Sequence, residues 1–270
     1  MSPKFLRSLQ SNRPDLPEAE KDPLYVQSLG RAMQVLSAFH QTDKPLTLQE
    51  IATISGVGRS AVQRMVFTLR AMGYVDRDPD DRGYVPGLRI LDHTLDFQRL
   101  NPVVVKAAPV LLELRRMARE RIDLSLWDDL RLVYASRLQS KREILSSTLI
   151  GHKVPLFCTS GGWAILAHLT DAEADALLTR SDRTQCTPKT ITDIKQLKRE
   201  IAKAREKGYA VAHEQILSGE IAMAAAILDA NRRPVAAIHL AASLAEWSPE
   251  EFEKQFAPLI IQAARTVSRA

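Results

Sequence analysis

One short segment of the chain carries arginine and glutamine side chains at a spacing that suits contact with nucleic-acid bases. Its apolar residues recur at i, i+3, i+4 and i+7 from Val62 to Leu69, which predicts a helix with one buried stripe. The polar residues of this helix point away from that stripe. Arginine can bond the guanine edge in the major groove of DNA, and glutamine can bond adenine. The candidate contact residues are Arg59, Ser60, Gln63 and Arg64.

Two features before this helix position it. Thr47 and Glu50 have the spacing of a capping box, which predicts a first helix from residue 48. Gly56 and Gly58 then break that helix, because glycine tolerates the positive φ of a tight turn. Two short helices joined by a glycine turn are typical of a DNA-binding helix-turn-helix. Thr47 is a further candidate DNA contact, and an ordinary helical hairpin with solvated arginines remains the alternative.

The neighbouring segments extend this unit to a winged helix-turn-helix. Residues 29–40 carry an apolar stripe and are predicted to form a helix capped by Ser28. Two short strands, 74–77 and 82–85, flank a Pro-Asp turn and predict a hairpin, the wing. Arg82 of the wing is a candidate phosphate contact, although four wing aspartates oppose a close approach to phosphate.

The second half of the chain has a different organisation. A short amphipathic helix at 88–98 precedes a longer helix at 102–119, which Pro109 is expected to kink or split. The apolar stripe of the longer helix is predicted to run through Val105, Ala108, Leu112 and Met117. From Ile122 the hydrophobic period falls to about 2, which indicates strands. The fold class is therefore α+β, a mainly antiparallel sheet with flanking helices. Strands are predicted at 122–126, 130–137, 144–150, 209–213, 221–228 and 235–242, and further helices at 160–169, 171–178, 193–207 and from 249 onward.

Composition limits the class of protein. A length of 270 residues suggests two domains, and 45% hydrophobic with 26% charged residues is typical of a soluble protein. No apolar run is long enough to cross a membrane, and the N-terminus lacks the apolar core of a secretory signal. Two cysteines form no disulfide framework. We expect a cytoplasmic protein without a cofactor or a membrane partner, with residues 1–24 as a mobile arm.

The chain resembles the IclR family of bacterial transcriptional regulators from about residue 25 to residue 264. The resemblance rests on the order and spacing of several short motifs and not on any one of them. In the first part these are Ser28-Leu29-x-Arg31-Ala32, Ser55-Gly56-Val57, Arg64-Met65 and Gly73-Tyr74-Val75. In the second part they are Gly151-x-x-Val154-Pro155-Leu156, Thr159-Ser160-Gly161-Gly162 and Gly208-Tyr209-Ala210.

The resemblance implies a ligand-responsive transcription regulator, either a repressor or an activator, that is not an enzyme. It implies a winged helix-turn-helix DNA-binding domain at 25–86, a linker helix at 87–101 and a GAF-like effector-binding domain at 102–270. The expected partners are double-stranded operator DNA, a small-molecule effector and further copies of the chain in a homodimer or homotetramer. The segment 25–29 is similar to that of members that control aromatic-acid catabolism.

The resemblance also implies where an effector binds. Carried over by position, the pocket residues are Ser160, Gly161, Ala212 or His213, Ala222, His239 and Ala241. Many relatives have serine where this chain has His239 and Ala241, and lysine where it has Trp163. Fewer hydroxyls and a cationic His239 would favour a larger or more aromatic carboxylic acid. The alternative for His239 is a histidine satisfied by its neighbours on a sheet face.

Two other classes of function remain open. A hydrolase-like enzyme built on the second domain needs a nucleophile and a base. Ser160 and His239 are the one candidate pair. A small-molecule sensor that acts by protein contact would not need Arg59, Gln63 or Arg64. Some family members hold zinc, but the histidines and Cys158 have no metal-ligand spacing here, so no metal is expected.

Overall fold

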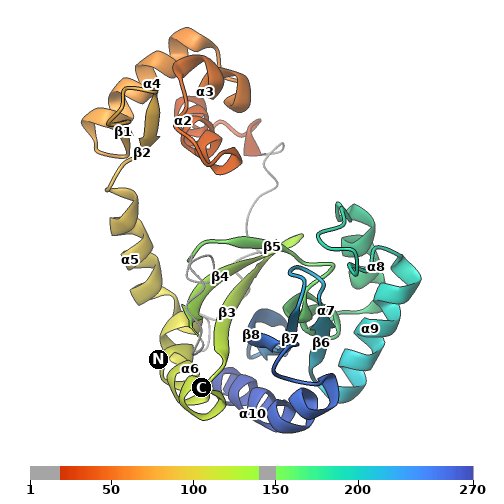
Figure 1. Cartoon of the computed structure of the whole chain (residues 1–270). Helices are drawn as coiled ribbons and strands as arrows, with labels where there is room; N and C mark the ends of the chain where they lie inside the picture. Colours follow the sequence, from red (N-terminus) through yellow and green to blue (C-terminus); the bar gives the residue numbers. More distant parts are fainter. Residues whose placement is uncertain (1–18, 140–149, 270) are drawn as a thin grey trace. The chain divides into compact units, whose positions relative to one another are not determined.

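A computed structural model describes residues 19–139 and 150–269 of the chain. These residues form two compact units, one that extends to Leu100 and one that begins at Asn101 (Figure 1). Most of the expected arm and nearly all of the predicted strand at 144–150 lie outside the described residues. Among the described helices, none combines the length and the apolar character needed to cross a membrane.

The first unit is a small helical domain around one apolar core. Its helices are α2 (Gln27–Ser37), η2 (Ala38–Gln41), α3 (Leu48–Ser55) and α4 (Arg59–Ala71). The core contains Val35, Ile51, Val62 and Val66, all nearly inaccessible to solvent. The predicted cap at Ser28 is wrong, because α2 begins at Gln27 and Val26 is its extended N-cap residue.

Local interactions hold the helix-turn-helix as the sequence predicts. The hydroxyl of Thr47 accepts a hydrogen bond from the backbone N–H of Glu50, and the Glu50 carboxylate accepts one from the backbone N–H of Thr47, which completes the capping box. These bonds from Thr47 lower the pKa of Glu50 to about 2. Gly56 ends α3 with a φ of 69°, in the left-handed region that glycine adopts without a Cβ penalty.

The wing follows α4 directly. Strands β1 (Val75–Arg77) and β2 (Tyr84–Pro86) pair in an antiparallel hairpin, which confirms the predicted wing. Helix α5 (Ile90–Leu100) completes this unit.

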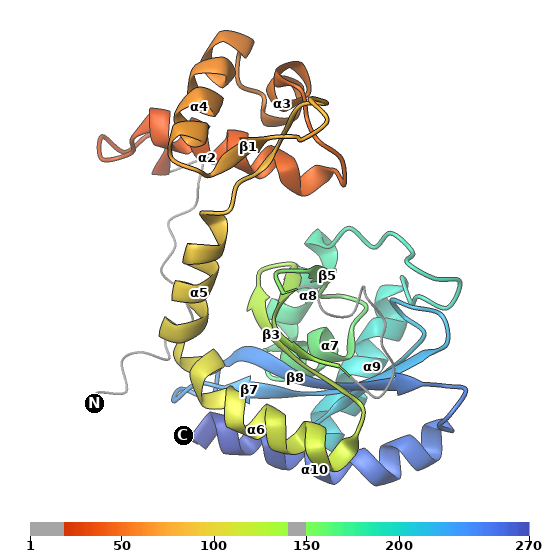
Figure 2. The same cartoon turned by 60° about the vertical axis from the view of Figure 1, so that its left-hand side comes forward.

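The second unit is a six-stranded antiparallel sheet covered by helices on both faces (Figure 2). Along one face lie α6 (Pro102–Ala118) and α10 (Pro249–Arg269), and their apolar side chains form one core with the sheet. On the other face α7 (Ser160–Leu166), α8 (Asp171–Arg180) and α9 (Ile194–Lys207) build a second core. The spatial order is β5 (Lys153–Pro155), β4 (Arg131–Leu138), β3 (Arg121–Asp128), β8 (Pro234–Ser243), β7 (Glu220–Leu228) and β6 (Ala210–His213).

Helix α6 differs from its prediction in two respects. The stripe expected to face the core is exposed, and the buried face instead carries Val104, Ala107, Leu111 and Leu114. The helix has apolar residues on both sides, so its periodicity does not identify the buried one. Pro109 does not split α6, which continues from Pro102 to Ala118. Pro109 lies on the exposed side, where water can bond the carbonyl that a proline leaves unpaired.

Candidate DNA-recognition helix and effector pocket

The outward face of α4 is free to meet a partner. Within residues 19–139 and 150–269, the side chains of its four candidate contacts have neither a hydrogen bond nor an ion pair, and all four are exposed. They are Arg59, Ser60, Gln63 and Arg64. The opposite face, with Val62 and Val66, is buried as the sequence predicts. An exposed helix face with unpaired Arg and Gln side chains has the chemistry needed to read base edges.

Thr47 and Arg82, the other two candidate DNA contacts, are held by their own domain. The hydroxyl of Thr47 donates to the Glu50 carboxylate over 2.8 Å, as part of the capping box. The guanidinium of Arg82 donates to the buried carboxylate of Asp78 through Nε at 2.9 Å and Nη2 at 3.1 Å. Hydrogen bonds to Asp78 raise the pKa of Arg82. In the wing Arg77 is likewise paired with Asp81, so aspartates already balance both wing arginines.

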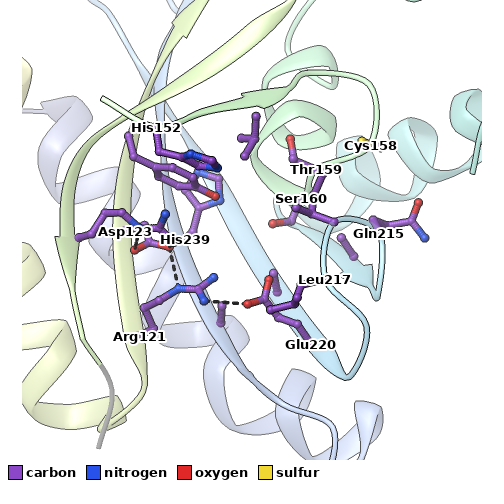
Figure 3. Close-up of a pocket in the computed structure, with 17 residues that line it drawn as sticks. Arg121, Asp123, His152, Cys158, Thr159, Ser160, Gln215, Leu217, Glu220 and His239 are labelled. Atoms are coloured by element: carbon purple, nitrogen blue, oxygen red, sulfur yellow. Dashed lines mark hydrogen bonds and ion pairs between the residues drawn. The ribbon is translucent and has the colours of Figure 1, made fainter. Parts of the chain in front are cut away.

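In the second unit, a cavity of about 250 Å³ lies over the face of the sheet that carries α7 (Figure 3). The strand register explains its floor. Arg121 on β3 lies opposite Ala241 on β8, which lies opposite Ala222 on β7. In the next row of the same face, Asp123 lies opposite His239. Small and polar residues therefore alternate with the apolar residues that face α6 and α10.

A network of charged side chains crosses this floor. Arg121 donates from Nε to Asp123 over 3.0 Å and from Nη1 to Glu220 over 2.7 Å (Figure 3). Arg137 donates to Asp123 from the other side, over 3.2 Å. Burial opposes the charge of Arg121, but the carboxylates of Asp123 and Glu220 outweigh it and raise its pKa. Burial raises the pKa of Asp123, and the two arginines counteract that rise.

Aromatic rings form another part of the wall. The rings of Tyr134 and His152 are stacked, 6.3 Å between centroids and 6° apart in plane. His239 meets the Tyr134 ring edge-on at 5.6 Å. Arg137 lies over the same ring at 4.0 Å, in a cation–π contact. Guanidinium groups and conjugated rings thus line the same cavity.

His239 is neutral, and the expectation of a cationic histidine is wrong. Burial lowers its pKa to about 3, and the nearby Arg121 and Arg137 act in the same direction. Its Nε2 is hydrogen-bonded to the hydroxyl of Ser125 at 2.7 Å. A Cβ at Gly161 would lie 2.2 Å from the His239 ring, so this glycine leaves space for the imidazole. Among the described residues, His239 has no hydrogen bond to Ser160, so the two do not form a nucleophile–base pair.

The structure brings together most of the pocket residues expected from the sequence. Lining the cavity are Ser160, Ala212, Ala222, His239 and Ala241. Gly161 packs against His239, whereas the exposed His213 lies outside the lining. Trp163 is buried and donates its indole N–H to the carbonyl of Phe157. Among the described residues, no three His, Cys, Asp or Glu side chains are placed to hold a metal ion.

Several lining residues were missed by sequence reasoning. They are the charged and aromatic residues of the floor and wall, Arg121, Asp123, Tyr134, Arg137, His152 and Glu220. One signal was present: polar residues alternate with apolar residues along the strand that begins at Arg121, in a domain whose sheet is covered on both faces. On a sheet with no solvent-facing side, such alternation indicates a cavity.

The low pKa of His239 predicts a pH dependence of stability. In the unfolded chain histidine titrates near 6.5, so on acidification the unfolded state takes up the proton first and the folded state loses stability. Between pH 6.5 and pH 5 the loss due to His239 is about 2 kcal/mol. We expect His239→Gln to unfold with a smaller decrease in stability over this range, measured by urea unfolding at each pH.

His152 and His168 also have pKa values lowered by burial, and they remain in both proteins. The difference between wild type and His239→Gln therefore isolates His239. Equal pH slopes for the two proteins would show that His239 is protonated in the folded state.

Comparison with known proteins identifies the two units. Residues 28–79 match the IclR helix-turn-helix domain, and residues 98–269 match the family described as bacterial transcriptional regulator IclR C-terminal. The Pca regulon regulatory protein of Pseudomonas putida is 26% identical over 245 residues, which cover 90% of this chain and 84% of that protein.

Solved structures agree over nearly the whole chain. The transcriptional regulator RHA06195 of Rhodococcus sp. RHA1 is 28% identical, with a TM-score of 0.78 over 91% of this chain and 98% of the other. An IclR homologue of Microbacterium hydrocarbonoxydans, solved with 4-hydroxybenzoate, has the same fold at 20% identity, with a TM-score of 0.72 over 90% and 98% of the two chains. This chain is therefore a DNA-binding transcriptional regulator of the IclR family, with a helix-turn-helix domain and an effector-binding domain.

Proposed function

We propose that this regulator responds to a small aromatic carboxylic acid, which binds in the pocket that Arg121, Tyr134 and His239 line. The observation that carries the proposal is the combination of guanidinium groups and aromatic rings around one cavity of about 250 Å³. A cavity of about 150 Å³ accommodates benzene, so there is room here for a single ring with a carboxylate. Guanidinium groups can bind a carboxylate with two parallel hydrogen bonds.

Two relatives support the same class of ligand. The Microbacterium homologue was solved with 4-hydroxybenzoate, and a curated relative is named as a regulator of the Pca regulon. His239, which the family resemblance places where many relatives carry serine, is neutral here and presents a ring beside Tyr134 at that point of the wall. The acid that we propose is therefore aromatic and not aliphatic.

On the DNA side, we propose that α4 reads the operator from the major groove through Arg59, Gln63 and Arg64. We assign the contacts with the DNA backbone to Thr47, Ser60 and Arg82. Arg82 can make its contact only if a phosphate displaces Asp78 from its guanidinium. A dimer would place two such helices in successive major grooves. A change in their spacing on effector binding would couple the pocket to the operator. Action on DNA fits a cytoplasmic location.

We further propose that a second copy of the chain covers the part of a groove in the DNA-binding unit that lies along α2, which leaves Arg64, on the α4 side of the groove, to the DNA. The groove, of about 1150 Å³, runs along α2, α4 and α5. Its apolar side chains are unusually accessible, with Leu29 62% exposed, Met33 53% and Met72 56%. Contiguous apolar surface of this kind is typical of a protein–protein interface. Sedimentation equilibrium of the wild-type protein, which also serves to test the groove, shows whether two such dimers pair into a tetramer.

Replacing Leu29 and Met33 together by glutamate should separate the dimer. Burying two carboxylates against an apolar partner is strongly unfavourable, so we expect a halved mass in sedimentation equilibrium and weaker operator binding. Gln34→Glu is the matched control, since it adds a charge to the exposed part of the same helix outside the groove. A double variant with unchanged mass would place the oligomer interface elsewhere.

The whole proposal is tested by binding of the purified protein to its own upstream intergenic DNA, titrated with aromatic and small aliphatic carboxylic acids. A salt-sensitive shift that one aromatic acid alters supports it. A shift altered by an aliphatic acid alone would overturn the proposed ligand class. Absence of a shift, with tight binding or turnover of an acid, would favour a sensor without DNA or an enzyme.

A further inference from the structure

The carboxylate of Glu220 already occupies the group in the pocket that is best suited to receive an acid. A guanidinium can hold a carboxylate along two edges, one that contains Nε and one formed by Nη1 and Nη2. On Arg121, Asp123 holds Nε at 3.0 Å and Glu220 holds Nη1 at 2.7 Å. Neither edge is therefore free for a two-bond contact with a ligand.

The two carboxylates on Arg121 differ in how readily a ligand could replace them. Asp123 is 1% exposed and is also bonded to Arg137, so it is fixed from two sides. Glu220 is 18% exposed, lies in the pocket lining, and has its carboxylate on Arg121 alone among the described residues. Glu220 is also the first residue of β7, directly after Gly219. Glu220 is the partner that can leave.

Arg137, the other arginine of the lining, does not offer an alternative. Its side chain is 6% exposed, both of its bonds go to Asp123, and it lies over the ring of Tyr134. A ligand carboxylate added beside Glu220 on the same nitrogen would bring two like charges together. Exchange on Arg121 keeps the guanidinium paired, and the partly exposed Glu220 carboxylate is released to water.

The sheet is built so that this exchange can take place inside the cavity. Arg121 reaches Glu220 across β8, over Ala241 and beside Ala222. Larger side chains at these two positions would separate the ion pair. The small side chains of Ala222 and Ala241 thus leave room for Arg121 to lie across the floor.

We propose that Glu220 is a built-in competitor for the effector, and that an acid binds by taking the Nη1–Nη2 edge of Arg121 from it. This inference rests on the proposed function, since it concerns the same pocket and the same class of ligand. Glu220 then sets the acid concentration at which the regulator responds, and it selects carboxylates over their neutral analogues, which cannot replace a charged partner.

The test is isothermal titration calorimetry of the full-length protein with benzoate and 4-hydroxybenzoate, and with the corresponding amides as neutral probes. We expect Glu220→Gln to bind the two acids about tenfold more tightly than wild type, because the ligand no longer breaks an ion pair to bind. Affinity for the amides should not change. Glu200→Gln is the matched control, since Glu200 pairs with Lys203 on the surface of α9, away from the pocket.

Other outcomes overturn the inference. Equal affinities of wild type and Glu220→Gln for the acids would show that Glu220 does not compete, and so would the same gain for acids and amides. If neither protein binds any acid, Arg121 is not a carboxylate receptor. Operator binding is measured on the same samples. A protein that binds the operator but no acid contradicts the proposed ligand and its competitor, and leaves the assignment as a DNA-binding regulator intact. If Glu220→Gln does not fold, Glu220→Ala removes the same carboxylate, and we expect the same gain in affinity for the acids and no change for the amides.

Discussion

Arg64→Ala is expected to weaken binding to the upstream DNA by about ten- to a hundredfold. Arg64 is exposed on α4 and has no partner in the described part of the chain, so its guanidinium is available to a base or a phosphate. A two-bond contact with guanine accounts for about 1–3 kcal/mol of discrimination. The measurement is fluorescence anisotropy of labelled DNA over a range of salt concentrations.

The salt series distinguishes the two kinds of contact. Loss of a phosphate contact should reduce the slope of log K against log salt by about 0.9 and weaken binding to all sequences alike. Loss of a base contact should leave the slope almost unchanged and reduce the preference for the operator. Arg199→Ala is the control, since Arg199 is also an exposed arginine and lies on α9 of the other unit. Unchanged affinity and slope in Arg64→Ala would exclude Arg64 from the interface.

The DNA-binding unit could be predicted well because its signals are local. The capping box of Thr47 and Glu50 and the left-handed Gly56 each depend on residues a few positions apart. The apolar stripe of α4 likewise identifies its outward face without knowledge of its neighbours. The cap of α2 was missed because Val26 provides only its backbone conformation, which has no side-chain signature.

The pocket could be predicted only in part, because its chemistry depends on strand register. Arg121 and Glu220 are 99 residues apart, and their contact requires three strands to align. Tertiary burial makes His239 neutral, and no neighbour in the sequence indicates that state. The predicted buried face of α6 is wrong for a related reason. The helix has two apolar faces, and only its packing against the rest of the fold determines which of them is buried.

Asp123→Asn is expected to destabilise the effector-binding unit by about 3 kcal/mol. Asp123 lies between Arg121 and Arg137, which are only 15% and 6% exposed, and removing one partner from a buried ionic network leaves its other charges uncompensated. All three tryptophans of the chain lie after residue 101, so their fluorescence in urea reports this unit separately. The unfolding midpoint should fall by roughly 1 to 2 M urea.

Asp175→Asn provides the matched control. Asp175 pairs with Lys198 at 2.7 Å on the surface, with both side chains about half exposed, so its loss should cost at most about 1 kcal/mol. Similar small losses in the two variants would show that water already compensates the charges around Asp123.

A second substitution distinguishes the cost of an uncompensated buried charge from the cost of lost packing. In Asp123→Asn combined with Arg137→Met, the remaining Arg121 keeps Glu220 as its partner, and the methionine can cover the Tyr134 ring that Arg137 now covers. Replacing a buried ion pair as a whole costs far less than removing one member of it, so the double variant should regain part of the stability that Asp123→Asn loses. Simple addition of two losses would mean that Asp123 acts through its shape and hydrogen bonds and not through its charge.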